Sequence, residues 1–168
     1  MHNLRQNRQR LAWIILTGAF LLCCALTVGL PLGARWYYRN AQVSHAARLT
    51  TLNGTVAVTR PGLPNPDAVY TTLERVPEES LITTDAASEG SLEFLDARAQ
   101  VLGALQVYGG TRLRLRSLRS PRFAGSPGSH EMTVELISGR VRVRLSVDVP
   151  RPVHLTLITP QSTAVFDQ

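Results

Sequence analysis

Histidines are the side chains of this sequence best suited to acid–base chemistry, and they lie far apart along it. His45 follows an apolar run, His130 lies in a predicted loop, and His154 lies in a predicted strand next to Pro152. No motif places them at a telling distance from a nucleophile or a carboxylate. We therefore expect a protein that is not an enzyme, with no catalytic residue and no cofactor.

Acidic residues and cysteines give weak indications of a metal site. Cys23 and Cys24 are the only cysteines, and they are adjacent within the apolar run, without the spacing of zinc ligands or a partner for a disulfide. Exposed turns explain the acidic pairs as well as a cation site would. These pairs are Glu78 with Glu79 and Asp85 with Glu89. We expect no bound metal.

Arginine supplies all of the basic charge, because the 18 basic residues include no lysine. Residues 49–97 hold two arginines and eight acidic residues, whereas residues 98–151 hold ten arginines and three acidic residues. The two segments therefore have opposite net charges. Six arginines of the basic segment alternate along two predicted strands, so that each set of three shares a face. They are Arg112, Arg114 and Arg116, and Arg140, Arg142 and Arg144.

Two interpretations of these six arginines remain open. They can form a solvated sheet face that Glu131, Glu135 and the acidic segment partly neutralise. Alternatively, they form a patch for an anionic partner, such as lipid headgroups, an envelope polymer or an acidic protein. Nucleic acid is not expected, because the export signal removes the domain from it and aromatic residues do not alternate with the arginines.

The element that determines where these residues lie is an uncharged apolar run from Leu11 to Leu30. A helix of this length, at about 1.5 Å per residue, crosses a hydrocarbon core of about 30 Å. Trp13 and the Trp36-Tyr37-Tyr38 sequence fit aromatic belts at its two ends. Pro31 with Gly33 predicts the end of the helix. We therefore predict a transmembrane helix over residues 11–34.

A cleaved signal peptide is the alternative, because Arg5, Arg8 and Arg10 precede the apolar run. The run is longer than the usual apolar region of a signal peptide, and the nearest small-x-small sequence, Ser44 to Ala46, lies too far from it. We therefore predict a retained signal-anchor and a single-pass protein of the cell membrane. Residues 1–10 are the expected cytoplasmic tail, 35–48 a juxtamembrane spacer, and 49–168 an extracytoplasmic domain.

From residue 49 onward the apolar residues alternate with a period of two, with turn residues at short intervals. This pattern predicts an all-β domain, a single small β-sandwich or roll of short antiparallel strands. Residues 69–73 are one expected strand, and residues 118–129 an expected loop. The strongest hairpin pattern runs from Glu131 to Leu145 across Ser138 and Gly139. In that hairpin Glu135 would face Arg142 and form an ion pair.

The order and spacing of these strands resemble a FecR-type domain, the extracytoplasmic β-domain of bacterial membrane-anchored regulators. The resemblance covers residues 49–168 and implies a role in ligand or protein recognition or in envelope signalling. It rests on six segments: Leu52 to Val56, Leu81 to Thr84, Ser91 to Asp96, Thr111 to Leu115, Val134 to Val143, and Ile158 to Pro160.

Three departures from the family limit what the resemblance implies. Glu79 and Ser80 replace the Gly-Asp that commonly precedes the Ile-x-Thr strand. The last strand is expected to run on past Gln168. The regulators handle a sigma factor through a sizeable cytoplasmic segment, and ten residues do not fold into such a domain. We therefore do not expect direct sigma-factor control. The alternative function is a structural envelope protein that docks on anionic polymer or lipid through its arginines.

Overall fold

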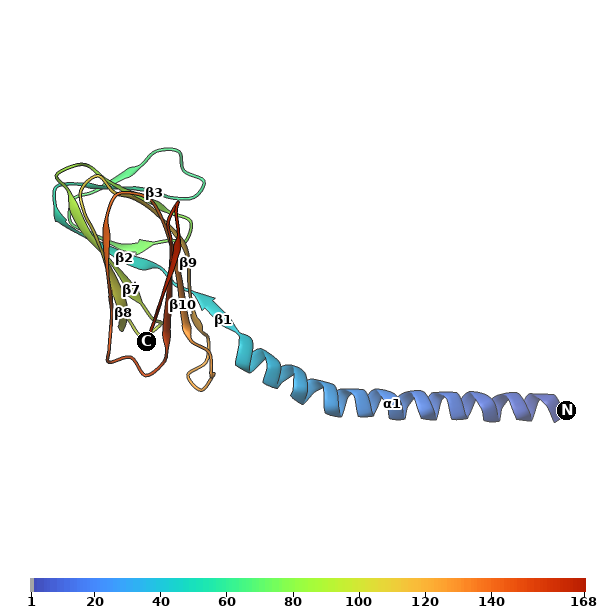
Figure 1. The fold of residues 1–168 in the computed structure, drawn as a ribbon. Helices are drawn as coiled ribbons and strands as arrows, with labels where there is room; N and C mark the ends of the chain where they lie inside the picture. Colours follow the sequence, from blue (N-terminus) through green and yellow to red (C-terminus); the bar gives the residue numbers. More distant parts are fainter. Residues whose placement is uncertain (1) are drawn as a thin grey trace. The chain divides into compact units, whose positions relative to one another are not determined.

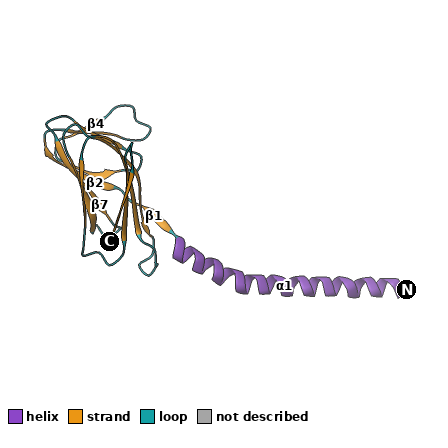
Figure 2. Cartoon of the chain, viewed as in Figure 1, coloured by secondary structure: helices purple, strands orange, loops and turns teal. Residues whose placement is uncertain are grey.

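The computed structural model describes the backbone of residues 2–168 and the side chains of residues 13–168, in two compact units, Met1–Asn40 and Ala41–Gln168. The first unit is a single helix, α1 (His2–Asn40), and the second consists of strands and their connections (Figure 2). The prediction of an all-β domain preceded by one apolar helix is confirmed.

Residues Trp13–Asn40 of α1 are long and apolar enough to cross a membrane, a property that a membrane anchor shares with a signal sequence. The predicted helix end at Pro31 is wrong, because α1 continues to Asn40. Proline removes one backbone donor, but helices in membranes tolerate it. At the end of α1, the Asn40 side-chain amide donates to the Trp36 carbonyl oxygen at 2.8 Å.

The larger of the two sheets has eight strands. Seven follow the order β13-β12-β10-β9-β6-β3-β4, and β1 pairs with the end of β9. All pairs are antiparallel except β10 with β12, which is parallel. The strands are β1 (Gln42–Ser44), β3 (Val56–Thr59), β4 (Asp67–Val69), β6 (Leu81–Thr84), β9 (Arg112–Pro121), β10 (His130–Ser138), β12 (Val153–Ile158) and β13 (Thr163–Asp167).

The smaller sheet has five antiparallel strands in the order β11-β8-β7-β2-β5. They are β2 (Ala47–Asn53), β5 (Thr72–Val76), β7 (Glu89–Leu95), β8 (Val101–Val107) and β11 (Val141–Leu145). Figure 1 shows β2, β7 and β8 on one side of the domain and β9 and β10 on the other. The two sheets therefore form the layers of a sandwich.

The core lies between the two sheets and follows directly from the alternation in the sequence. Along β7, Leu92 and Phe94 are buried whereas Ser91 and Glu93 face outward. A fully buried leucine side chain stabilises a fold by roughly 1.5–3 kcal/mol. The largest fully buried side chains come from both sheets: Phe94, Leu49, Ile82, Leu92, Leu102, Leu105, Leu113, Leu115, Leu118, Met132, Leu155 and Val56.

The β-domain begins earlier than the sequence indicates. Residues 35–40 continue α1, and most of the expected spacer that follows them is strand. Gln42, Val43 and Ser44 pair with Pro121, Ser120 and Arg119 of β9. The partner of β1 is about 80 residues away in the sequence, which is why the short polar segment gave no local strand signal.

Two other local predictions are corrected. The single strand expected at residues 69–73 is divided between β4 and β5, which belong to different sheets. The loop expected at residues 118–129 is strand as far as Pro121, because Leu118 and Ser120 are buried in the core face of β9. His130, expected in a loop, is the first residue of β10.

The predicted hairpin from Glu131 to Leu145 is wrong in its pairing. β10 lies between β9 and β12, and β11 pairs with β8 in the other sheet. Since both edges of β10 are occupied, the turn at Ser138 and Gly139 carries the chain from the larger sheet to the smaller one. The expected ion pair between Glu135 and Arg142 therefore does not form.

Thr111 holds this crossing in place. Its hydroxyl donates to the carbonyl oxygen of Arg140 and accepts from the Arg140 backbone N–H, both at 3.0 Å. Gly139 has a φ of 95°, and a Cβ at that position would lie 2.4 Å from the Thr111 Cα. Glycine is required here, because both the conformation and the close approach exclude a side chain.

Candidate functional site

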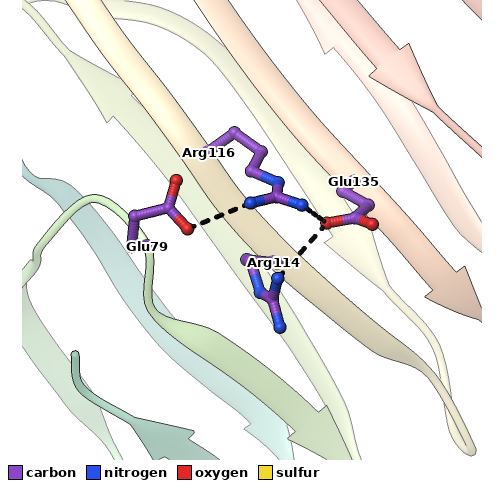
Figure 3. Close-up of polar contacts among 4 residues, drawn as sticks. All are labelled: Glu79, Arg114, Arg116 and Glu135. Atoms are coloured by element: carbon purple, nitrogen blue, oxygen red, sulfur yellow. Dashed lines mark hydrogen bonds and ion pairs between the residues drawn. The ribbon is translucent and has the colours of Figure 1, made fainter. Parts of the chain in front are cut away.

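Two of the six predicted site arginines are neutralised on the outer face of the larger sheet. Glu135 of β10 lies opposite Arg114 of β9 in the strand register. The Glu135 carboxylate lies 2.8 Å from an Arg116 nitrogen and 3.8 Å from an Arg114 nitrogen, and Glu79 adds a contact of 3.3 Å to Arg116. Figure 3 shows Arg116 between the two carboxylates. This part of the structure agrees with the interpretation as a neutralised sheet face.

Arg112 and Arg140 lie at the end of the sandwich where the chain crosses between the sheets. Arg112 is exposed at the start of β9 and has no ion pair among the described side chains. The Arg140 guanidinium lies 4.6 Å from the ring centroid of Tyr108, a cation–π contact. From this end, the two sets of arginines run along different sheets, so the six do not form one continuous face.

Arg142 and Arg144 lie on β11, at the edge of the smaller sheet, and both are exposed. Across the sheet their neighbours are Gln106 and Ala104, which carry no charge. Ala104, the neighbour of Arg144, pairs in turn with Glu93 on β7. The Glu93 carboxylate lies 3.6 Å from a nitrogen of Arg48. Among the described side chains, neither Arg142 nor Arg144 forms an ion pair, and the same is true of Arg112.

The three histidines considered for catalysis each have a different hydrogen-bonding partner. His45 lies between β1 and β2, and its backbone N–H donates to Leu118. His154, on the outer face of β12, contacts the Asp167 carboxylate at 2.5 Å. His130 is buried and forms a 2.8 Å hydrogen bond between Nδ1 and the Ser120 hydroxyl.

Burial lowers the pKa of His130, and the positive charge of Arg151 lowers it further. Asp96 acts in the opposite direction by raising this pKa. The burial of His130 could not be predicted from the sequence. His130 follows a glycine- and proline-rich segment, and its partner Ser120 lies within the segment predicted as a loop.

The acidic pairs considered as cation sites have structural partners. A carboxylate oxygen of Glu78 accepts the Leu118 backbone N–H at 2.7 Å, and Glu79 pairs with Arg116. Asp85 accepts a hydrogen bond from the Ala87 N–H, and hydrogen bonds from Ser88 and Ala87 lower its pKa. The described side chains contain no group of three or more histidine, cysteine or acidic residues suited to hold a metal ion.

Comparison with known proteins gives no relative. No family model, curated protein or solved structure matches the chain. The FecR-type resemblance is one of the order and spacing of the sequence segments given above.

Proposed function

We propose that this protein is a single-pass, membrane-anchored recognition module whose β-domain lies outside the cytoplasm and has no catalytic role. The observation that carries the proposal is the direct continuity of an apolar helix with a folded domain. Helix α1 ends at Asn40, and β1 begins at Gln42. A domain joined so closely to its anchor is held at the membrane surface, where a recognition module meets envelope partners.

The position of β1 supports a retained anchor over a cleaved signal sequence. The nearest cleavage sequence, Ser44 to Ala46, begins at the last residue of β1 and ends directly before β2. Cleavage after Ala46 would remove β1, which pairs with β9 and belongs to the larger sheet. Removal would leave the end of β9 unpaired on the edge that β1 occupies, while β10 still pairs with Arg119 on the other edge. An uncleaved chain therefore keeps all the strands of the larger sheet, which supports a retained anchor.

The FecR-type resemblance supports the extracytoplasmic recognition role. In this proposal the β-domain binds a ligand or protein, as the extracytoplasmic domain of such a regulator does. Any signal that reaches the cytoplasm passes through a second protein. The experiment is crosslinking in intact cells, followed by purification of the full chain through a C-terminal tag. We expect a discrete envelope component to be crosslinked to the chain. Its absence under every growth condition tried would contradict the recognition role.

Docking on anionic envelope polymer is a second candidate function, and the exposure of Arg142 and Arg144 favours it. Among the described side chains neither arginine forms an ion pair, unlike Arg114 and Arg116. Since exposed charges are screened by salt, docking through them should weaken as the ionic strength rises.

Sedimentation of the detergent-solubilised full chain with isolated cell walls tests this second function. Replacing both Arg142 and Arg144 with Glu should abolish salt-sensitive sedimentation. The matched control reverses Arg75 and Arg119, two exposed arginines on other strands, and should sediment as the wild type does. Equal behaviour of the two double variants would exclude docking through β11.

A further inference from the structure

A polar pocket of about 460 Å³ lies at one end of the sandwich. Its lining includes residues from the connection between β7 and β8, namely Asp96, Ala97, Arg98 and Gln100. It also includes Ser120 and Pro121 at the end of β9, and Arg122 and Ala124 just after it. His130 and residues 149–151 complete it. Its volume falls within the range of roughly 300–1,000 Å³ typical of small-molecule sites. None of the six arginines predicted from the sequence lines it.

The pocket carries an excess of positive charge. Arg98, Arg122 and Arg151 line it, and Asp96 is the only carboxylate in the lining. Asp96 is engaged by its own turn, since one carboxylate oxygen accepts the backbone N–H groups of Arg98 and Gln100, both at 2.8 Å. Among the described side chains, no ion pair involves Arg98 or Arg151.

Two of the pocket groups are held in position. The Arg151 guanidinium donates to the carbonyl oxygen of Phe123 at 3.0 Å and also to that of Ala124. His130 is bound to Ser120 and is 5% exposed. Groups that are already ordered lose less conformational entropy when a ligand binds. A cationic wall with fixed donors is suited to an oxyanion, and guanidinium groups match phosphate geometry.

We propose that this pocket binds a phosphate group through Arg98 and Arg151, with His130 at its wall. The inference rests on the proposed recognition function, since it names the chemical class of ligand. The phosphate can belong to a lipid headgroup or to a soluble compound. A lipid headgroup is considered as the source of the phosphate because of the chain connection. The pocket residue Pro121 pairs with Gln42, which follows the last residue of α1 by two positions.

His130 supplies a local readout. The charge of Arg151 contributes to lowering its pKa, so an anion beside Arg151 should raise this pKa. Asp96 and His45 are the other charged or titratable groups that influence it. Histidine-labelled full chain in neutral detergent micelles is titrated with inorganic phosphate while the His130 NMR signal is followed. We expect a saturable change and a raised His130 pKa.

Variants make the assignment specific. Arg98→Gln should weaken phosphate binding about tenfold, as expected for a lost hydrogen bond to a charged group. Ala97→Glu, at an exposed pocket position, should abolish binding. The matched control Arg75→Gln removes the same charge from β5, outside the pocket lining, and should bind as the wild type does. Circular dichroism checks that each variant is folded.

Nanodiscs distinguish the two sources. If phosphatidylglycerol discs reproduce the His130 change and discs of a phosphate-free glycolipid do not, the ligand is a lipid headgroup. If only inorganic phosphate produces it, the ligand is soluble, and either result supports the pocket. The proposal is overturned if neither probe gives a saturable response, or if Arg75→Gln weakens binding as much as Arg98→Gln. Because these measurements use purified protein, they do not depend on the orientation of the chain in the cell.

Discussion

Glu135 contacts two arginines that alternate along β9, Arg114 and Arg116. Its side chain is 28% exposed, compared with 37% for Arg114 and 39% for Arg116. Partial exposure limits the energy of such pairs, because water and salt screen them. The alternation of the arginines predicted which face they share, but the sequence could not identify Glu135 as their partner.

Replacing Glu135 with Gln should lower the free energy of unfolding by about 1 kcal/mol, because two arginines lose a shared carboxylate. Urea unfolding of the full chain in detergent, followed by circular dichroism, measures this. Glu131→Gln is the matched control on the same strand, because Glu131 is exposed and forms no ion pair among the described side chains. This variant should change the free energy of unfolding by less than about 0.5 kcal/mol. Equal losses would show that the ion pairs contribute nothing specific.

His130 should make the domain less stable in acid. Its folded-state pKa is lowered from the usual value of 6.5, so the unfolded chain takes up a proton at a higher pH than the folded chain does. The contribution of His130 is therefore complete above about pH 6.5 and is lost as the pH falls through the lowered pKa. Unfolding free energies measured at pH 7.5 and pH 5 for wild type and His130→Gln test this. The wild type should lose more stability than the variant, and identical losses would contradict the assignment.

At the scale of elements, the sequence predicted most strands but not their partners. The period of two in β10 and β11 correctly identified two strands, and Ser138 with Gly139 correctly identified a turn. Local pattern does not distinguish a hairpin from a turn between sheets, because both place apolar residues on the core face. What decides the pairing is non-local: β12 occupies the free edge of β10, and Thr111 binds Arg140.

Gly139→Ala should therefore destabilise the domain strongly. A Cβ there meets the Thr111 Cα at 2.4 Å and its Oγ1 at 2.5 Å, in addition to the cost of a φ of 95°. Gly110→Ala is the control, since Gly110 has a φ of 68° and open space around it. The control should lose about 1–2 kcal/mol for conformation alone, and Gly139→Ala clearly more. If the two variants lose the same amount in urea unfolding, the crossing is not held as described.

At the scale of the whole molecule, the fold combines the acidic and basic segments of the sequence. Each sheet takes strands from both segments, so that Glu79 reaches Arg116 in one sheet. Fold class and the apolar helix could be predicted from periodicity and composition. The pocket could not, because its residues come from three connections that only the sandwich brings together.

We propose that α1 holds the β-domain at the outer face of a membrane, and protease treatment of intact spheroplasts is the decisive experiment for this topology. The cells carry the full chain with a C-terminal epitope tag, and a cytoplasmic protein serves as the internal control. We expect added protease to remove the tag from intact spheroplasts while the cytoplasmic control protein is not cleaved. Full protection of the tag until the spheroplasts are lysed would contradict the topology and the function proposed from it.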